Sequence, residues 1–313
     1  MTRTPVVRRS TLILPVNVPR FVEKAHLRGA DAVMLDLEDA VPSAEKAAAR
    51  DPIREAIRQV GRGGAEVFVR VNHEPSMLNE DLEAAIYPGL TGICFPKTES
   101  PDQVERLDML VAGLEGSRGM VAGCIELALL IENPRGLLNC EAIAAVSRRV
   151  RTIALGPEDY CLALGVEPSE NGTELLYPLS AVVTVSKAAE IAPMGLLGSI
   201  GSFWDLSRFE QAACRAKELG CVGASCIHPD QVAVLNRVFS PAPEQISAAK
   251  AVVEAFQRGV ESGTASVNVA GRMVDIPVYM RARTLLQRAE AIAAVERRKA
   301  AALAQATDPG TAS

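Results

Sequence analysis

Three acidic side chains stand within four residues at the end of one apolar run. Residues 32–41 read AVMLDLEDAV, so Asp36, Glu38 and Asp39 follow the apolar residues directly. A continuous apolar run is typical of a parallel strand that is covered on both faces. Two unit charges about 4 Å apart interact by roughly 4 kcal/mol at an effective dielectric constant of 20, so the cluster needs solvent or positive charge. The alternative is a strand end that simply turns into water.

Polar side chains also follow most of the later apolar runs. They are Arg70, Asn72, Lys97, Glu132, Glu158, Asp159 and His228. One such residue alone usually belongs to a solvated loop, but their recurrence along the chain indicates a shared rim. In a barrel of alternating strands and helices, catalytic groups lie at the carboxyl ends of the strands. The sequence therefore predicts one site that is built from several strand ends.

Glu132 and Asp159 are the candidate metal ligands, because each follows a strongly apolar run. Hard oxygen donors favour Mg²⁺, which keeps several waters and takes one or two protein carboxylates. With only three histidines in the chain, a histidine-rich zinc site is not expected. Asp159 has an alternative role as the N-cap of the helix ahead of YCLALG, and one carboxylate can serve both purposes.

Arg70 is a charged residue within the nearly apolar run VFVRVN. A buried charge is costly unless it is paired, which leaves two interpretations. The first is a salt bridge to Glu38 or Asp39 inside the rim. The second is bidentate capture of a substrate carboxylate, a geometry for which the guanidinium group is suited.

Segments of five to eight apolar residues alternate with longer helical patterns along most of the chain. The predicted strands cover residues 10–15, 32–39, 66–72, 92–97, 127–133, 151–159, 196–203 and 222–229. Eight strand–helix repeats within about 240 residues fit a (β/α)8 TIM barrel. One of the predicted helices covers residues 43–60, with Ser43 as its N-cap. A doubly wound sheet is the alternative, but it usually carries a glycine-rich turn where this chain reads PVNVPR.

The chain after the barrel follows a different pattern. We assign residues 1–240 to the barrel and residues 241–305 to a C-terminal appendage of helices and a β-hairpin that turns at Ala270-Gly271. The appendage is too small for a core of its own, so it must pack on another surface. Residues 306–313 read ATDPGTAS and are expected to be a disordered tail.

Composition excludes several classes of protein. The net charge is −5, which provides no basic surface for nucleic acid. No uninterrupted apolar stretch approaches 18 residues, so no membrane span is expected. The seven cysteines are odd in number and contain no C-x-x-C pair, which favours small buried hydrophobic residues in a reducing compartment. We therefore expect a soluble cytoplasmic protein.

Eight ordered motifs between residues 9 and 295 resemble the citrate lyase β-subunit-like proteins of the HpcH/HpaI aldolase superfamily. They are RSTLILPVNVPRFVEKA, GADAVMLDLEDAV, VFVRVN, FPKTES, IENPRG, ALGPEDYCLALG, IHPDQV and GRMVDIP. The resemblance implies a CoA-ester lyase with Mg²⁺ held by Glu132 and Asp159. It also implies that Arg70 grips the carboxylate of a small keto acid, that Glu132 lies beside the substrate, and that Asp275 of a neighbouring subunit completes the site. The appendage would then cover an adjacent barrel in a homotrimer or hexamer.

Two departures from the family pattern concern the CoA end. Many relatives have a lysine shortly before I-H-P, where this chain has Ala224 and Ser225. The missing contact could come from Arg20 or Lys24. The first-strand motif usually reads V-P-G, whereas here residues 14–16 read LPV, so the close backbone approach that glycine allows is lost.

The expected reaction is a reversible retro-Claisen cleavage of a malyl-, citramalyl- or citryl-CoA thioester into a keto acid and acetyl-CoA. Asp275 is the candidate acid for the acetyl-CoA enolate, with a helix cap as its alternative role. His228 is expected to be structural or to contact CoA. Asp36, Glu38 and Asp39 are expected to orient metal waters and to pair with Arg70 or Lys97.

The sequence is compatible with three other activities. A thioesterase could use the same scaffold, and so could a citrate lyase subunit that acts on an acyl-carrier-protein thioester. A barrel that binds CoA esters without catalysis is the third, and the presence of Glu132, Asp159 and Arg70 argues against it.

Overall fold

The structure is a computed structural model, and it describes residues 5–201, 203–261, 266–269 and 272–307. The chain forms two compact units. The first contains the described residues up to Phe239 together with those from Lys299 onward, and the second spans Ser240–Arg298.

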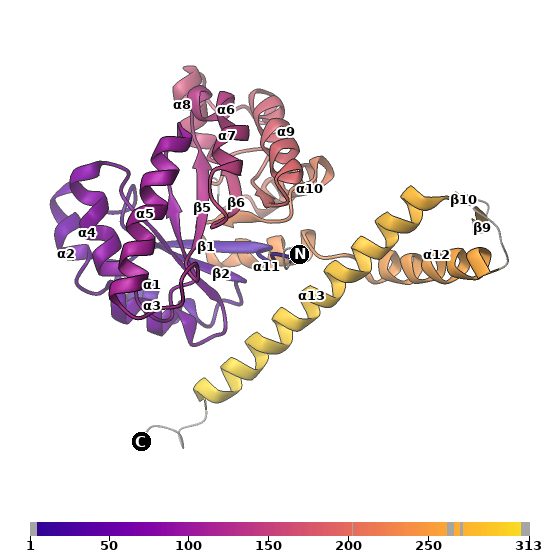
Figure 1. Cartoon of the computed structure of the whole chain (residues 1–313), viewed down its shortest axis with the longest axis horizontal. Coiled ribbons are helices and arrows are strands. Elements are labelled where there is room, and N and C mark those ends of the chain that lie inside the picture. The colour runs from indigo at the N-terminus through magenta and orange to yellow at the C-terminus, as the bar shows by residue number, and fades with distance from the viewer. Residues whose placement is uncertain (1–4, 202, 262–265, 270–271, 308–313) are drawn as a thin grey trace. The chain divides into compact units, whose positions relative to one another are not determined.

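Eight parallel strands form the sheet of the first unit (Figure 1). They are β1 (Ser10–Pro15), β2 (Ala32–Asp36), β3 (Glu66–Arg70), β4 (Gly92–Phe95), β5 (Glu126–Ile131), β6 (Val150–Leu155), β7 (Ala192–Met194) and β8 (Ala224–Cys226). The strands pair in chain order from β1 to β7, and β8 pairs with β1. Backbone hydrogen bonds of 3.0 Å from Val222 to Pro193 and from Gly195 to Gly223 join the two remaining edges. The sheet is a nearly closed (β/α)8 barrel, and the doubly wound alternative, which needs a reversal of strand order, is excluded.

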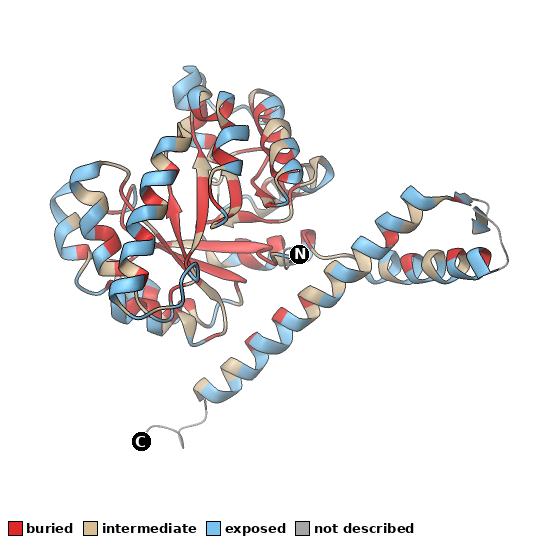
Figure 2. Ribbon diagram, viewed as in Figure 1, coloured by how far each residue is buried: buried red, intermediate tan, exposed pale blue. Residues whose placement is uncertain are grey.

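Helices follow the strands and cover the outside of the barrel (Figure 1). They are α1 (Pro19–Ala25), the 3₁₀ turn η1 (Ser43–Glu45), α2 (Lys46–Ala49), α3 (Ile53–Gly61), α4 (Pro75–Ala85), α5 (Pro101–Ser117), α6 (Pro134–Leu138), α7 (Cys140–Ala145), α8 (Pro157–Leu164), α9 (Thr173–Ala188), α10 (Leu206–Leu219) and α11 (Pro229–Val238). The strands are almost wholly buried, whereas each helix keeps an exposed outer face (Figure 2).

Strand residues alternate between the inside of the barrel and the layer under the helices. Ala32, Met34, Phe68, Cys94 and Ala128 form the small inner cluster. The residues between them, such as Val33 and Val69, belong to the larger cluster that packs against the helices. This alternation determines which side chains reach the inside at the carboxyl end of each strand.

A buried arginine closes the amino-terminal end of the barrel. Arg8 is 4% exposed, and its Nε donates to Glu66 Oε2 at 2.5 Å. A second ion pair joins Arg8 to Glu126. The guanidinium carbon of Arg8 lies 4.5 Å from the centre of the Phe68 ring. Because this end is filled by charged pairs, the opening for a ligand lies at the carboxyl ends of the strands.

The predicted strand over residues 196–203 was wrong, because β7 lies at Ala192–Met194. Leu196 and Leu197 are 2% and 5% exposed, so the apolar pattern marks burial correctly. These leucines nevertheless follow the strand and take no part in its ladder with β6. Pro193 argues against a strand at this position in the sequence, because proline has no N–H to donate to a β-ladder.

The predicted helix over residues 43–60 is divided into η1, α2 and α3. Pro52 explains the division, since proline disfavours the helical conformation of the residue before it and lacks an N–H donor. Ser43 was wrongly predicted as an N-cap, because the cap position of η1 is Pro42 and no side chain caps it.

The second unit contains α12 (Pro243–Glu261), the strands β9 (Val267–Val269) and β10 (Arg272–Val274), and most of α13 (Ile276–Thr307). β9 and β10 pair antiparallel as the expected hairpin, while its predicted turn at residues 270–271 lies outside the described residues. In the first unit, Lys299 Nζ donates to Asp31 Oδ1 at 2.8 Å. The predicted tail starts within α13, and residues 308–313 are outside the described part of the chain.

No helix in the described ranges is long and apolar enough to cross a membrane. All seven cysteines are unpaired, and five of them are buried.

Candidate active site

The inward-facing row of the barrel turns polar one layer above the inner cluster. Asp36 and Arg70 lie two residues after the inward-facing Met34 and Phe68, and Glu132 lies four residues after Ala128. All three therefore continue the inward-facing rows of their strands. The same step on β6, from Ala154, leads to Gly156. The side chains expected at one rim are therefore brought together by strand alternation and by the register of the sheet.

Asp36 and Arg70 are opposite each other in the pairing of β2 with β3. Arg70 Nε donates to Asp36 Oδ1 at 2.8 Å, and Nη2 donates to Oδ2 at 2.6 Å. Asp36 is fully buried and also accepts the backbone N–H groups of Glu38 and Ala40. Burial opposes the charge on Arg70, but its bonds to Asp36 outweigh that effect and raise the pKa of the guanidinium. The bidentate pair fixes the plane of Arg70 within the rim.

Glu38 and Asp39 share the two basic side chains of the rim. Arg70 Nη1 lies 3.1 Å from Glu38 Oε2 and 3.5 Å from Asp39 Oδ2. Lys97 Nζ contacts Glu38 and lies 3.4 Å from Asp39 Oδ1. Burial raises the pKa of Glu38, whereas the pKa of Asp39 is lowered because the neighbouring Glu38, Arg70 and Lys97 outweigh its own burial. The acidic cluster is therefore paired within the protein and does not turn into water.

Glu132 lies apart from these ion pairs. Its side chain is 4% exposed, and its Oε2 accepts the backbone N–H of Lys97 at 2.6 Å. Lys97 adopts a φ of 48°, an unusual value for a residue other than glycine. Burial and the neighbouring Asp159 raise the pKa of Glu132 to about 7, although the Lys97 N–H and the Arg70 charge act in the opposite direction. This carboxylate is buried with acids nearby, and no basic side chain among the described residues is bonded to it.

Gly156 provides the space that Glu132 occupies. A Cβ at position 156 would lie 2.5 Å from Glu132 Cγ and 2.6 Å from its Oε1. Such distances do not occur between unbonded atoms, so any other residue here would displace the carboxylate. This role was not foreseen, and the only signal for it in the sequence was a glycine within the predicted strand over residues 151–159.

Asp159 and Glu158 lie in the first turn of α8, whose N-cap is Gly156. The N-cap alternative for Asp159 is therefore wrong, although an acid in the first turn still interacts favourably with the helix dipole. Asp159 is close enough to Glu132 to raise its pKa. Glu158 is exposed and contacts the Ser199 hydroxyl, so it turns away from this pair.

The charge balance of the rim suits a cation. Its carboxylates are Asp36, Glu38, Asp39, Glu132 and Asp159, and its basic side chains are Arg70 and Lys97. Five acids and two bases leave three negative charges in excess when all of them are ionised. No cluster of three or more histidines, cysteines or acids with metal-binding geometry occurs among the described residues. Two oxygen donors at Glu132 and Asp159 fit Mg²⁺, which takes few protein ligands and retains waters.

A further set of polar residues contains Asn72, which was predicted at the rim, together with Lys46 and Asp81, which were not foreseen. Lys46 Nζ donates to Asn72 Oδ1 at 2.6 Å and to Glu38 O at 2.9 Å. Asn72 is buried, and its side chain donates to Leu37 O at 3.0 Å and to Asp81 Oδ2 at 2.7 Å. These bonds fix the backbone that carries Glu38. Asp81, a fully buried acid in α4, had no recognisable sequence signal.

His228 is the N-cap of α11. Its Nδ1 accepts the backbone N–H of Asp230 at 3.3 Å, and its ring stacks on Phe203 with 5.4 Å between centroids. Together with Arg20 and Pro15, His228 lines a cavity of about 270 Å³ at the end of β1. The structure thus places His228 at a helix start and at this cavity, with Ala224 and Ser225 in β8 before it.

Asp275 belongs to the second unit, where it precedes α13. Its Oδ1 accepts the backbone N–H of Val278 at 3.1 Å, and its carbonyl accepts the N–H of Tyr279 at 2.9 Å. These bonds are those of a helix cap, so the structural alternative is present. A carboxylate has a second oxygen, and this contact leaves that oxygen available for another role.

The family model and the similar proteins of known name all indicate one family of lyases. Residues 9–229 match the model of the HpcH/HpaI aldolase/citrate lyase family. The chain is 35% identical to citrate lyase subunit beta of Escherichia coli strain K12, over 92% of this chain and 94% of that protein. It is 30% identical to L-malyl-CoA/beta-methylmalyl-CoA lyase of Cereibacter sphaeroides, over 91% of this chain and 96% of that protein.

Solved structures agree in fold. CitE of Mycobacterium tuberculosis, in complex with magnesium, acetoacetate and coenzyme A, superposes with a TM-score of 0.72 at 26% identity, covering 91% of this chain and 99% of that chain. A citrate lyase from Burkholderia xenovorans has a TM-score of 0.78 at 17% identity, with 93% of each chain covered, and supports the fold alone. This chain belongs to the HpcH/HpaI aldolase/citrate lyase family and is a carbon–carbon lyase.

Proposed function

We propose that this lyase is Mg²⁺-dependent and cleaves a 3-hydroxyacyl-CoA thioester of the malyl, citramalyl or citryl type into a small keto acid and acetyl-CoA. The observation that carries the proposal is the buried Glu132, which has Asp159 beside it and no bond to a basic side chain in the part of the chain that the structure describes. The complex of M. tuberculosis CitE with magnesium, acetoacetate and coenzyme A supports the same chemistry.

Glu132 and Asp159 would hold the metal. When bound, Mg²⁺ would supply a Lewis acid that polarises the hydroxyl and carboxylate oxygens of the substrate. Lys97 prepares this position, because its backbone N–H orients one oxygen of Glu132 and leaves the other free of that bond. Gly156 keeps the path to Glu132 clear.

Arg70 would bind the carboxylate of the keto-acid fragment. Two of its nitrogens are held by Asp36, so the side chain is already oriented before the substrate arrives. Its remaining nitrogen, Nη1, lies 3.1 Å from Glu38 and 3.5 Å from Asp39. A substrate carboxylate would replace the weaker of these contacts, and Lys97 would retain the displaced acid.

The cleavage requires that the substrate hydroxyl transfer its proton to a water molecule while the adjacent C–C bond breaks. The bonding electrons then form the enolate of acetyl-CoA, whose methyl carbon must take up a proton. We assign this proton to Asp275 of a second copy of the chain, in a homotrimer or hexamer. One oxygen of Asp275 caps α13 and would hold the carboxyl group in place while the other acts.

The CoA end would use the cavity at the end of β1. Arg20, Arg28 and His228 line it, together with the exposed Phe21. The arginines could bind phosphate in place of the lysine that this chain lacks near Ala224 and Ser225, and Lys24 follows one turn after Arg20 on α1. In this arrangement His228 contacts CoA and does not transfer a proton.

A citrate lyase subunit that acts on an acyl-carrier-protein thioester is the second candidate. It is favoured by the identity of 32–35% to proteins named citrate lyase subunit beta. A malyl-CoA thioesterase on the same scaffold is the third. For each activity we propose a cytoplasmic location, which the unpaired cysteines support.

A panel of malyl-, citramalyl- and citryl-CoA with product identification tests the proposal. We expect acetyl-CoA together with glyoxylate, pyruvate or oxaloacetate, and loss of the reaction when EDTA removes the metal. Free malate and CoA without a keto acid would instead establish the thioesterase. Co-purification with an acyl carrier protein, and cleavage of its citryl thioester alone, would establish the citrate lyase subunit.

A further inference from the structure

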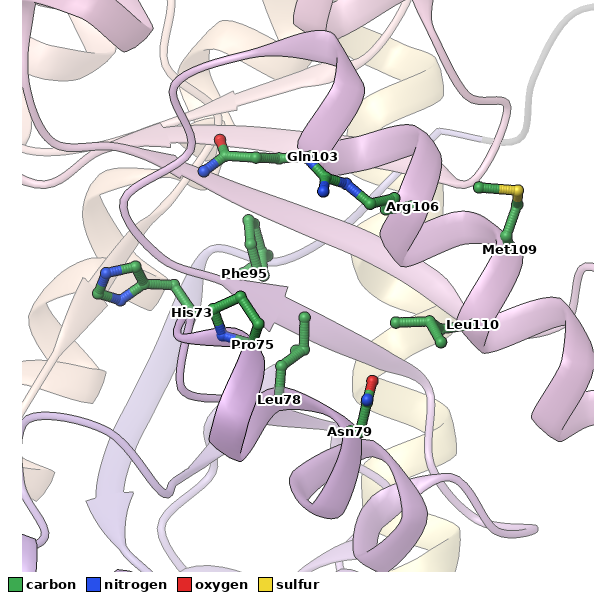
Figure 3. A pocket seen from close by; sticks show the side chains of 9 residues that line it. All are labelled: His73, Pro75, Leu78, Asn79, Phe95, Gln103, Arg106, Met109 and Leu110. Carbon is green, nitrogen blue, oxygen red and sulfur yellow. The ribbon is translucent and has the colours of Figure 1, made fainter.

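A cavity of about 560 Å³ lies outside the barrel between α4 and α5 (Figure 3). Phe95, the last residue of β4, lines it and is 2% exposed. Phe95 belongs to the outer apolar cluster, whereas its neighbour Cys94 belongs to the inner one. The cavity is therefore on the opposite side of the strand from the inward-facing row that carries Arg70 and Glu132.

The walls of the cavity differ in character. Pro75 and Leu78 of α4 and Leu110 of α5 provide apolar surface, and Figure 3 shows them below and beside Phe95. Arg106 of α5 carries the only permanent charge among the lining residues. It forms no ion pair with any residue that the structure describes. An apolar hollow with one unpaired cation at its wall complements an anion that has an apolar body.

Gln103 adds a hydrogen-bond donor beside Arg106 (Figure 3). Its Oε1 accepts the backbone N–H groups of Glu99 at 2.8 Å and Ser100 at 3.1 Å. Because both partners are donors, the other end of the amide must be the NH₂ group, which remains available at the cavity wall. Two neighbouring donors, one of them charged, match the oxygens of a carboxylate or a phosphate.

We propose that this cavity binds an amphipathic anion, with its head group on Arg106 and Gln103 and its apolar body against Phe95, Leu78 and Leu110. The volume suits a chain or ring system of roughly eight to twelve non-hydrogen atoms, since ligand sites of about 300–1,000 Å³ accept molecules of this size or larger. The site does not depend on the function proposed above.

A ligand in the cavity would restrict the position of active-site residues. Phe95 and Gln103 stand at the two ends of residues 96–102, and both line the cavity. Lys97 lies within this segment, where its N–H binds Glu132 and its Nζ contacts Glu38. A ligand that holds both ends of the segment restricts the backbone of Lys97, and through it the position of the Glu132 carboxylate.

Isothermal calorimetry with octanoate, octyl phosphate and octanol tests the site on the full chain. We expect at least one of the two anions to bind about tenfold more tightly than octanol, because only the anions can use Arg106. The stronger of the two identifies a carboxylate or a phosphate head group. Arg106→Gln should weaken that anion about tenfold, whereas Arg148→Gln, which removes an exposed arginine elsewhere, should leave its affinity unchanged.

Hydrogen exchange locates the bound anion. The anion that binds more tightly should slow exchange in residues 96–103 and 73–78, which contain lining residues of the cavity. Equal binding of octanol, no binding of either anion, or unchanged exchange at Lys97 would overturn the proposal. A smaller oligomer of Leu110→Glu would also overturn it, because a second copy of the chain would then be the occupant.

Discussion

The backbone N–H of Lys97 donates to Glu132 Oε2 over 2.6 Å, while the side chain of the same lysine contacts Glu38. One residue of the β4–α5 connection thus links the ion-paired part of the rim to the Glu132 carboxylate. This division explains how the rim can hold five acids. Asp36, Glu38 and Asp39 form ion pairs with Arg70 and Lys97, whereas Glu132 lies near Asp159 and outside these ion pairs.

Glu132→Gln should stabilise the metal-free protein at alkaline pH. The pKa of Glu132 is raised from 4.5 to about 7, so the folded state binds its proton more tightly than the unfolded state. Wild-type stability therefore falls as the pH rises from about 4.5 to about 7 and stays reduced above it, by about 3 kcal/mol for this group. In urea titrations with EDTA, the advantage of the variant should be small at pH 5 and largest at pH 8. An advantage that does not change with pH would contradict the shifted pKa.

Stabilisation by Mg²⁺ should show the opposite pH dependence. A protonated Glu132 cannot bind the ion, and a pKa of about 7 leaves about a tenth of this group ionised at pH 6 and about nine tenths at pH 8. The apparent Mg²⁺ affinity should therefore rise about tenfold between these values. Thermal shift at increasing Mg²⁺ concentration measures this change. Asp159→Asn should remove most of the Mg²⁺-induced increase in Tm at both pH values. Equal increases in the variant and the wild type would exclude Asp159 as a ligand.

Strand alternation explains why much of this site was predictable. Asp36, Arg70 and Glu132 follow apolar runs, and parallel strands bring their carboxyl ends to one edge. The ion-pair partner of Arg70 was harder to predict, because the choice of Asp36 over Glu38 for the bidentate pair depends on the register of β2 with β3. An apolar run indicates that a segment is buried and leaves its register open.

The contributions of backbone atoms and empty space could not be predicted in the same way. The N–H of Lys97 reaches Glu132 because Lys97 has a positive φ, and Gly156 leaves room for the Glu132 side chain because it has no Cβ. Neither property is visible in residue types. The misplaced β7 has a related cause, since Leu196 and Leu197 are buried beside the barrel without joining its ladder.

Gly156→Ala should abolish Mg²⁺ binding. The added Cβ would meet Glu132 Cγ at 2.5 Å, so the carboxylate must leave its position under the Lys97 N–H. Thermal shift should show no response to Mg²⁺, and cleavage of the CoA ester should be lost. Gly113→Ala is the matched control, because nothing lies within 4 Å of its added Cβ. An unchanged Mg²⁺ response in Gly156→Ala would show that Glu132 does not bind the ion from this position.

Arg70→Lys should separate charge from geometry. Lysine keeps the positive charge but cannot make the two parallel bonds to Asp36 that measure 2.8 and 2.6 Å. We expect a loss of about 1–3 kcal/mol in the free energy of unfolding and a fall in kcat/KM of about tenfold or more. Arg58→Lys alters an exposed pair with Glu55 and should change stability by less than about 0.5 kcal/mol. Full activity of Arg70→Lys would show that the bidentate hold is unnecessary.

Mixed oligomers test whether Asp275 acts in a neighbouring barrel. Glu132→Gln and Asp275→Ala subunits, co-expressed with different tags, should each be inactive alone. If a site combines Glu132 of one copy with Asp275 of the next, random assembly in equal amounts leaves about a quarter of the sites intact. Hetero-oligomers isolated through both tags contain no inactive homo-oligomers, so they should recover about a third of wild-type activity if the assembly is a trimer and about a quarter if it is a hexamer. If both residues act within one chain, every site keeps one defect and no activity returns. Asp275→Asn helps to interpret the result, because asparagine still caps α13 through Val278 and removes only the acid.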